Sequence, residues 1–327
     1  MLKHILSQSI LATVAYADAL NMPLTAMEVW RGLVGVQGTG YRGQGIENRA
    51  KNASSFSEIF FMLKLLKEQK KISEQRGFYF LPGKEDLVAE RLWRMRVADE
   101  KWKKLMGIVR WLRAVPFLRA VFVTGSLALN NTRENSDYDI FLVSAPGRIF
   151  TVRFFVTLML KMFGMYRSDA CVADHVCPNH YVTERSLAIP FHSLYTAHIF
   201  ATCVRTWSVD QDIKERFMHV NNWIHDYIQI APEIPRANRH TLPDIWVAKI
   251  IRGIGEVTLG PPVGGVLEGM ARFLQLVKIR ANPKTKYPGS GHVVANDEML
   301  AFHPSSPEFG VLDKYHTNML QYKTSVD

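Results

Sequence analysis

In residues 1–85, hydrophobic positions first recur at helical spacing and then alternate. Three apolar-periodic runs predict three helices, and two of these runs open with a capping box. The capping pairs are Thr25 with Glu28 and Ser55 with Glu58. The sequence that follows, KISEQRGFYFLPG, alternates around a turn near Arg76 and Gly77. It predicts a short β-hairpin after the third helix.

Three helices followed by a two-stranded hairpin is the order of elements in a winged-helix unit, a relative of the helix-turn-helix. We therefore expect residues 1–85 to form a winged-helix-like domain, with residues 55–70 as its recognition helix. The lysines of this helix either contact phosphates or form a solvated basic face; they are Lys64, Lys67, Lys70 and Lys71. A G-x-G-x-x-G pattern runs from Gly38 to Gly43, but it follows a helix and no βαβ unit surrounds it. A glycine-rich loop explains it better than a dinucleotide site does.

A long and strongly basic run predicts a connecting helix over residues 86–115. Pro116 ends this helix. The runs FLRAVFVTG, IFLV and HVCPNHYVT then predict three strands, with an apolar helix near residues 149–164. We assign residues 116–190 to a central unit with a sheet and residues 191–327 to a mostly helical C-terminal region.

Charge and cysteine content narrow the classes of function. The 327 residues carry a formal charge of +10, which favours a polyanionic or phosphorylated partner. Three cysteines are too few, and odd in number, for a disulfide framework, and they favour a reducing compartment. The N-terminal apolar stretch is broken by polar residues as an amphipathic helix is, and no apolar run reaches the roughly 20 residues that cross a bilayer. We expect a cytoplasmic protein with no membrane partner.

Two aspartates, Asp137 and Asp139, lie one residue apart at the start of the strand that contains IFLV. Side chains alternate along a strand, so both carboxylates point to the same face. Because two close, buried carboxylates repel each other, we expect a cation between them, and Mg²⁺ prefers oxygen ligands of this kind. Gly125 and Ser126 close the preceding strand. A glycine there lets the backbone approach a phosphate, and Ser126 can direct its hydroxyl and N–H at the same anion.

The segment GSLALNNTRENSDYD resembles the motif of the DNA polymerase β-like nucleotidyltransferase superfamily, and especially that of its minimal nucleotidyltransferases. In haloacid-dehalogenase phosphatases and many glycosyltransferases the apolar run precedes the aspartates, whereas here it follows them. The residues that match the motif are Gly125, Ser126, Ser136, Asp137 and Asp139, with Arg133 at a basic position of the loop. The resemblance implies that Asp137 and Asp139 hold Mg²⁺ (or Mn²⁺) and that Gly125 and Ser126 bind the triphosphate of an NTP.

The resemblance also implies a third carboxylate on a later strand, where it acts as a base or completes the metal site. The candidate strand VCPNHYV offers Asn179 and His180 but no acid. The nearest acids are Asp174 and Glu184. We expect Asp174 to complete the site; without it, an amide cannot take a proton from an attacking hydroxyl, and catalysis is weakened.

Two further positions are candidates for other contacts. Arg148, after the aspartate strand, either meets the triphosphate or is an ordinary surface arginine. A run of cysteines and histidines suggests zinc, but its spacing does not fit a structural zinc site; its members are Cys171, His175, Cys177 and His180. Leu127 and Leu129 stand where minimal nucleotidyltransferases often carry arginines.

The expected fold class is α+β: a nucleotidyltransferase-fold mixed sheet flanked by helices, preceded by a winged-helix-like domain and followed by a helical C-terminal region. The expected function is Mg-dependent transfer of a nucleoside monophosphate from an NTP to an acceptor. The basic charge weakly favours RNA or DNA as that acceptor. The alternative is a non-catalytic protein on a degenerate nucleotidyltransferase fold that binds nucleic acid or senses nucleotide. The missing strand acid favours this alternative, and the retained aspartates disfavour it.

Overall fold

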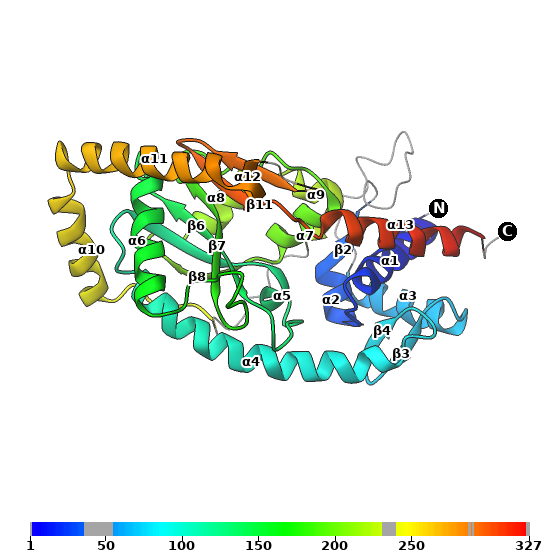
Figure 1. Cartoon of the computed structure of the whole chain (residues 1–327). Coiled ribbons are helices and arrows are strands. Elements are labelled where there is room, and N and C mark those ends of the chain that lie inside the picture. Colours follow the sequence, from blue (N-terminus) through cyan, green and yellow to red (C-terminus); the bar gives the residue numbers. More distant parts are fainter. Residues whose placement is uncertain (1, 36–54, 231–239, 287–288, 290, 325–327) are drawn as a thin grey trace.

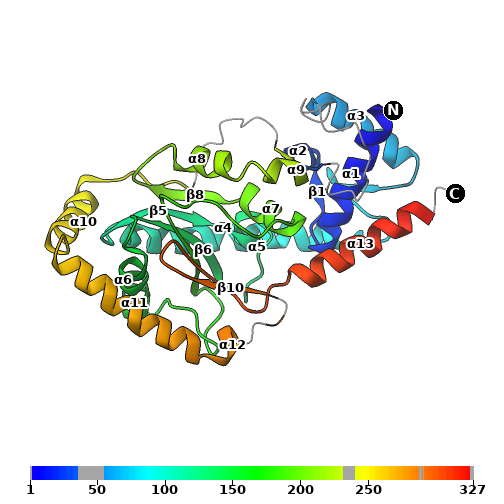
Figure 2. The ribbon, with the colours of Figure 1, turned by 90° about the horizontal axis from the view of Figure 1, so that it is seen from above.

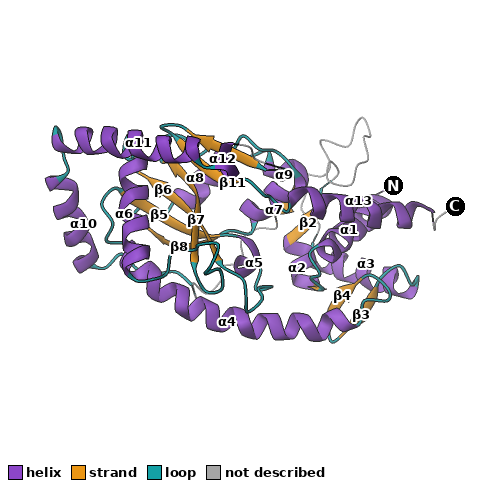
Figure 3. Cartoon of the chain, viewed as in Figure 1, coloured by secondary structure: helices purple, strands orange, loops and turns teal. Residues whose placement is uncertain are grey.

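The structure is a computed structural model that describes residues 2–35, 55–230, 240–286, 289 and 291–324 (Figure 1). A mixed sheet lies at its centre with helices around it, and a smaller, mostly helical unit lies at one end (Figure 3). The G-x-G-x-x-G pattern from Gly38 to Gly43 lies outside the described residues.

The N-terminal unit contains the predicted helices and hairpin and a few short strands. Its elements are α1 (Leu2–Ala19), β1 (Leu24–Thr25), α2 (Ala26–Arg31), β2 (Gly32–Val34), α3 (Phe56–Glu68), β3 (Ser73–Gln75) and β4 (Phe78–Phe80). Both predicted capping boxes form, because the side chains of Thr25 and Ser55 accept hydrogen bonds from the backbone of Glu28 and Glu58. Strands β3 and β4 form the predicted hairpin, and β1 joins them in the order β1-β4-β3.

Helix α4 (Asp86–Leu112) runs along one side of the molecule, from the N-terminal unit to the central sheet (Figure 1). Its apolar stripe is buried against that sheet, with Trp102, Leu105 and Val109 almost inaccessible to solvent. The predicted connecting helix is therefore also one layer of the central core.

The central sheet has six strands in the order β10-β11-β7-β6-β5-β8. Strands β6 and β7 run parallel and the other neighbours run antiparallel. The elements of this part are β5 (Leu118–Val123), α5 (Gly125–Ala128), β6 (Tyr138–Ser144), α6 (Ile149–Met162), β7 (Val176–Thr183), α7 (Leu194–Ala201), β8 (Val204–Ser208), β10 (His292–Ala295) and β11 (Met299–His303). The three strands predicted between 116 and 190 are present. Strands β8, β10 and β11 extend the same sheet with residues from the region expected to be mostly helical.

Two apolar layers cover the sheet. One layer consists mainly of α4 and α6, and the other of α7, α8 (Ile213–Val220), α9 (Ile224–Tyr227) and parts of α1 and α13 (Glu308–Thr324). Along β6, Ile140 and Leu142 point to the first layer, whereas Phe141 and Val143 point to the second. Since side chains alternate, Asp139 shares the face of Phe141.

The C-terminal part begins with α10 (Trp246–Thr258), α11 (Val263–Ala281) and α12 (Pro283–Lys286). The two long helices lie at the end of the molecule opposite the N-terminal unit (Figures 1 and 2). Helix α13 then returns to α1, where Asn318 donates a hydrogen bond to the carbonyl oxygen of Ala15 at 3.0 Å. A short pair, β2 with β9 (Ile228–Ile230), adds a second link to the N-terminal unit. Within the described residues, no helix combines the length and the apolar character needed to span a membrane.

Candidate functional site

The Gly-Ser turn contacts the aspartate strand directly. Gly125 follows β5 with φ +67°, a conformation that glycine adopts readily and other residues rarely do. A Cβ atom at Gly125 would lie 2.8 Å from Oδ2 of Asp139. The backbone N–H of Thr124 also donates to the carbonyl oxygen of Asp139 at 3.0 Å. The turn and the second aspartate are thus fixed against each other, and only glycine leaves room for that carboxylate.

The two aspartates form one cluster with a cysteine. Ligand atoms of Asp137, Asp139 and Cys177 all lie within 4.8 Å of one another. Arg167 pairs with Asp137, with its Nε 2.8 Å from Oδ2, and Asn179 donates from Nδ2 to Oδ1 of Asp139 at 2.9 Å. Burial and then the charge of Asp137 raise the pKa of Asp139 to about 7, against the smaller opposing effects of Arg167 and Asn179. The negative charge of the two aspartates is therefore only partly neutralised by Arg167 and Asn179.

A β-bulge in β7 brings Asn179 into the cluster. The register of β6 with β7 shifts by one residue between Ile140 and Phe141, which leaves Asn179 as the extra residue. Cys177 is paired directly with Asp139. Burial and the charges of Asp139 and Asp137 raise the pKa of the Cys177 thiol to about 12. Strand β7 thus presents a protonated thiol and an amide where the resemblance implied a carboxylate.

Asp174 does not complete the site. Its carboxylate accepts from Nζ of Lys101 at 2.6 Å, from Lys104 and from the hydroxyl of Tyr138 at 2.9 Å. Tyr138 stands between the two aspartates in the sequence, so its side chain points to the opposite face of β6. Burial alone would raise the pKa of Asp174, but the bonds from Lys101, Lys104 and Tyr138 outweigh it and lower that pKa to about 2. The catalytic role predicted for Asp174 is therefore corrected, because this carboxylate joins the loop before β7 to α4.

Glu184 and Arg148 lie at the other end of the strands. The N–H of Glu184 donates to the carbonyl oxygen of Ser144, the last residue of β6, so Glu184 is about 20 Å from the start of that strand. Arg148 precedes α6, with its guanidinium 4.8 Å from the ring centre of Phe117. The structure therefore brings neither residue to Asp139, and the predicted contact of Arg148 with a triphosphate at the aspartates is corrected.

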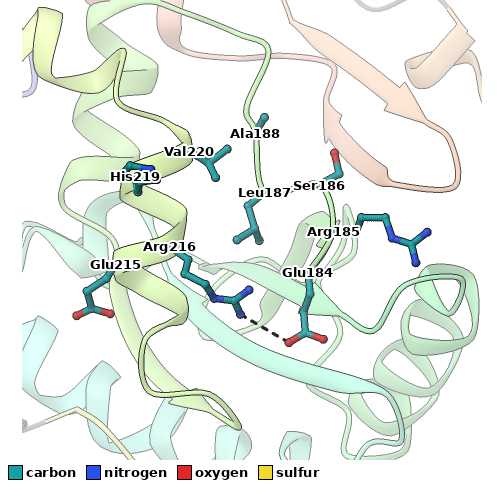
Figure 4. Close-up of a pocket in the computed structure, with 9 residues that line it drawn as sticks. All are labelled: Glu184, Arg185, Ser186, Leu187, Ala188, Glu215, Arg216, His219 and Val220. Carbon is teal, nitrogen blue, oxygen red and sulfur yellow. Dashed lines mark ion pairs between the residues drawn. The ribbon is translucent and has the colours of Figure 1, made fainter.

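Glu184 instead borders a separate cavity of about 580 Å³ (Figure 4). This cavity lies at the C-terminal end of β7, whereas the aspartates lie beside the start of that strand. Its walls carry both signs of charge, and the Nη2 of Arg216 lies 3.9 Å from Oε1 of Glu184. The cavity is thus distinct from the aspartate cluster.

The loop between the Gly-Ser turn and Asp137 is closed by Ser136. The backbone N–H of Arg133 donates to Oγ of Ser136 at 3.2 Å, and the N–H of Ser136 donates to the carbonyl oxygen of Arg133 at 3.1 Å. The side chain of Ser136 therefore shapes the turn that presents Asp137. Ser126 is half-buried in α5, and Arg133 is exposed.

Cationic side chains of α4 donate hydrogen bonds to the same loop. Arg91 donates to the carbonyl oxygens of Leu129 and Asn130 at 3.1 and 2.8 Å, and Lys101 donates to that of Ser136 at 2.8 Å. The side chains of Arg91 and Lys101 are almost fully buried. This part of the basic helix holds the loop in place and does not offer its charge to an external polyanion.

Two residues of the cluster were not predicted as its members. Arg167 reaches Asp137 because an isolated bridge pairs the adjacent Tyr166 with Val176, a long-range contact without a local sequence signal. Cys177 was considered only as a zinc ligand. His180, which was considered with it, is buried with its ring edge-on to Phe141, so the four predicted zinc candidates do not converge.

The cluster can bind a divalent cation or an anion held by Arg167, and the Gly-Ser turn gives a phosphate access to the backbone. Only the geometry of the cluster indicates which chemistry it can carry out. Comparisons of the chain with known protein families, with curated proteins and with solved structures give no match.

Proposed function

We propose that this protein is a nucleotidyltransferase that moves a nucleoside monophosphate from an NTP to an acceptor at the cluster of Asp137 and Asp139. The contact between Gly125 and the carboxylate of Asp139 carries this proposal. It places a turn suited to phosphate beside two carboxylates suited to a metal ion. A salt-bridged surface strand would need neither the glycine nor its conformation.

The residues of the cluster fit a divalent cation. Asp137 and Asp139 offer oxygen ligands on one face, and burial together with the charge of Asp137 raises the pKa of Asp139. These two residues would hold Mg²⁺ or Mn²⁺, and a bound ion would neutralise charge on the phosphates of the NTP. Cys177 is a poor ligand for Mg²⁺ because thiolates prefer softer metals.

The chain itself supplies groups that orient the triphosphate. Gly125 lets the backbone approach a phosphate closely, and the N–H and hydroxyl of Ser126 follow it in the turn. Arg167 is the cation of the site, and its guanidinium can bind two phosphate oxygens at once. Arg167, which pairs with Asp137 in the structure, would bind the triphosphate of an NTP held at the aspartates.

Apart from the two aspartates that would hold the metal ion, the cluster provides no evident base. The amide of Asn179 cannot accept a proton, and Cys177 keeps its proton at neutral pH because its pKa is raised to about 12. A hydroxyl acceptor would therefore need to lose its proton to solvent. We propose that the acceptor attacks with an oxygen that is already ionised at neutral pH, in a phosphate or carboxylate group.

Transfer of label from an NTP tests this function. The protein is incubated with Mg²⁺, each labelled NTP and acceptors that carry either a phosphate monoester or only hydroxyl groups. We expect label on the ionised acceptor, and its loss in the Asp137→Ala/Asp139→Ala double variant. Asp297→Asn is the matched control, because this exposed aspartate pairs with Arg272 of α11 and neither residue belongs to the cluster. Transfer that persists in the double variant contradicts the proposed site.

A second candidate is a protein that binds nucleotide without transferring it. The specific observation in its favour is the pair Cys177 and Asn179 at the position of the third carboxylate. Calorimetry with a non-hydrolysable NTP and Mg²⁺ distinguishes the two candidates. Binding without any transfer to any acceptor supports the second one.

The N-terminal unit fits a winged-helix-like domain for nucleic acid. We propose this because its three helices surround a sheet of order β1-β4-β3, whose hairpin turns at Arg76 and Gly77 with φ of +54° and +80°. Lys64 and Lys70 of the predicted recognition helix region are exposed, whereas Lys67 pairs with Glu74. Binding of duplex or single-stranded nucleic acid that weakens steeply with salt would support this role.

A further inference from the structure

Helices α10 and α11 expose many of their large apolar side chains, whereas some of their polar side chains are buried or half-buried. On α10, Trp246, Ile250 and Ile254 form a stripe with 51–72% of each side chain exposed. On α11, Val266, Phe273 and Val277 form a second stripe with 53–67% exposed. A surface helix of a globular protein normally presents the opposite arrangement. We call these two stripes the apolar corner.

Hydrogen bonds fix α10 in this orientation. The buried Arg252 pairs with Asp244 at 2.8 Å and donates to the carbonyl oxygen of Arg113 at 2.7 Å. Glu256 pairs with Arg119 at 2.6 Å. Rotation of α10 to bury its apolar stripe would break these contacts and leave charged groups without partners.

Helix α11 is fixed in the same manner. The carboxylate of Glu268 accepts from the backbone N–H groups of Phe150 and Thr151, which begin α6, at 3.0 and 2.8 Å. Gln275 donates to the carbonyl oxygen of Phe150 at 2.9 Å and accepts from Arg153 at 2.8 Å. The exposed stripes are therefore the outcome of specific inward contacts.

The exposed charges on the helical segment that carries the apolar corner have one sign. Residues 245–286 contain two acids, Glu256 and Glu268, and both are bound inward as described above. The exposed charged side chains of this segment are all cationic: Lys249, Arg272, Lys278, Arg280, Lys284 and Lys286. Two of them meet acids of other elements, Arg272 with Asp297 and Lys284 with Asp169. The net charge of the surface remains positive.

We propose that the apolar corner binds the surface of an anionic phospholipid bilayer. Apolar stripes that include tryptophan and phenylalanine enter the headgroup region, and flanking lysines and arginines meet lipid phosphates. Neither helix is suited to cross the bilayer, so the protein lies on it.

The charge distribution favours a bilayer over a second copy of the chain. A two-fold interface would place the same cations opposite each other, because both subunits use the same surface. Like charges that face each other across an interface oppose association. An anionic bilayer instead complements both the apolar stripes and the cations.

Co-sedimentation with vesicles tests the proposal on the full-length protein. We expect binding to vesicles of phosphatidylcholine with phosphatidylglycerol, weak binding to phosphatidylcholine alone, and loss of binding as salt rises. The variant Phe273→Asp is expected to bind anionic vesicles at least ~10-fold more weakly. The control Phe309→Asp makes the same change on α13, at a side chain that is 72% exposed, and is expected to bind as the wild type does.

Charge reversal and fluorescence add independent readouts. Lys278→Glu with Arg280→Glu is expected to weaken binding to anionic vesicles by ~10-fold or more. The blue shift of tryptophan emission on binding is expected to shrink in Trp246→Phe. The Asp137→Ala/Asp139→Ala variant is expected to bind vesicles normally, so this proposal and the proposed enzymatic function fail separately. Equal binding to neutral vesicles, no binding to anionic ones, or a dimer that Phe273→Asp dissociates would overturn the proposal.

Discussion

Asp139 and Asp174 lie on opposite sides of strand β6 and have opposite surroundings. Asp174 is held by Lys101, Lys104 and Tyr138, which lower its pKa to about 2. Burial and Asp137 instead raise the pKa of Asp139, with Arg167 as a partial counter-charge. The negative charge of Asp174 is neutralised by its neighbours, whereas the negative charge at Asp139 is only partly neutralised. Carboxylates that are only partly neutralised are typical of functional sites.

The difference between Asp139 and Asp174 is tested most directly by neutralising each carboxylate in turn. Asp139→Asn is expected to reduce nucleotidyl transfer by ~100-fold or more, because a metal ligand is lost. Asp174→Asn is expected to leave the chemistry nearly intact when both variants are assayed below their unfolding temperatures. Steady-state kinetics with label transfer checks this. Equal loss in the two variants would show that Asp174 does contribute to the reaction.

Substitution of Gly125 is expected to have the next largest effect. In Gly125→Ala, the new residue must adopt a positive φ and its Cβ atom meets Oδ2 of Asp139. We expect this variant to destabilise the fold by ~2–3 kcal/mol and to weaken NTP binding. Gly147→Ala is the matched control, because Gly147 also has φ +67° but a Cβ there meets nothing within 4 Å. We expect about 1 kcal/mol for the control. Thermal unfolding of both variants measures the difference, and similar losses would argue against a close contact with Asp139.

The stability provided by Asp174 should depend on pH. Because its folded pKa of about 2 lies below the unfolded value near 3.9, its stabilisation is present above pH 4 and is lost as pH falls towards 2. The full linkage is ~2–3 kcal/mol, and partial exposure to solvent reduces it. We expect Asp174→Asn to lower the free energy of unfolding at pH 7 and to have little effect at pH 2. Denaturant titrations at several pH values check this, and a constant difference would contradict the assignment.

The contribution of Asp139 to stability should depend on pH in the opposite direction. Its folded pKa of about 7 lies above the unfolded value near 3.9, so the native state binds the extra proton and metal-free stability falls as pH rises from about 4 to 7. Asp139→Asn should flatten this fall, which is at most ~4 kcal/mol between pH 4 and pH 7. Saturating Mg²⁺ should flatten it as well, because a cation favours the ionised carboxylate. A slope that neither change affects would place the titrating group elsewhere.

The smallest effect concerns the third ligand position. Cys177→Asp places a carboxylate opposite Asp139 on β7, and we expect several-fold faster transfer to hydroxyl acceptors, since a base becomes available. Cys177→Ser is the control of similar size without a base. Parallel assays with ionised and hydroxyl acceptors would show whether the gain is limited to the latter. A gain in neither would indicate that proton removal does not limit the reaction.

The parts of the fold and site that follow from local patterns were predicted from sequence. The strands around Gly125 and Asp139 and both capping boxes have signals within a few residues. The position of Asp174 was not predictable in this way, because it depends on partners in α4 some 70 residues away. The recruitment of Arg167 and the bulge at Asn179 depend on strand pairing, and a one-residue shift in pairing changes which side chains face the site.

The C-terminal helices show a different limit of sequence patterns. The C-terminal region was predicted to be mostly helical, and α10 and α11 form in it, but helical periodicity alone does not say which face of a helix points inward. Arg252 and Glu268 determine the orientation through contacts with Asp244 and the start of α6. The short strands β8, β10 and β11 were not predicted, because this region was expected to be mostly helical.

The packing of α13 against α1 affects how the chain acquires its structure. The hydrogen bond from Asn318 to Ala15 joins positions 303 residues apart, and Tyr16 shares a core with Tyr315. Contacts over such a separation are slow to form, because a very long loop must close first. During synthesis, α1 therefore leaves the ribosome long before its partner helix exists. Its apolar face must be shielded in the meantime, and we expect chaperone dependence to be greatest for this helix.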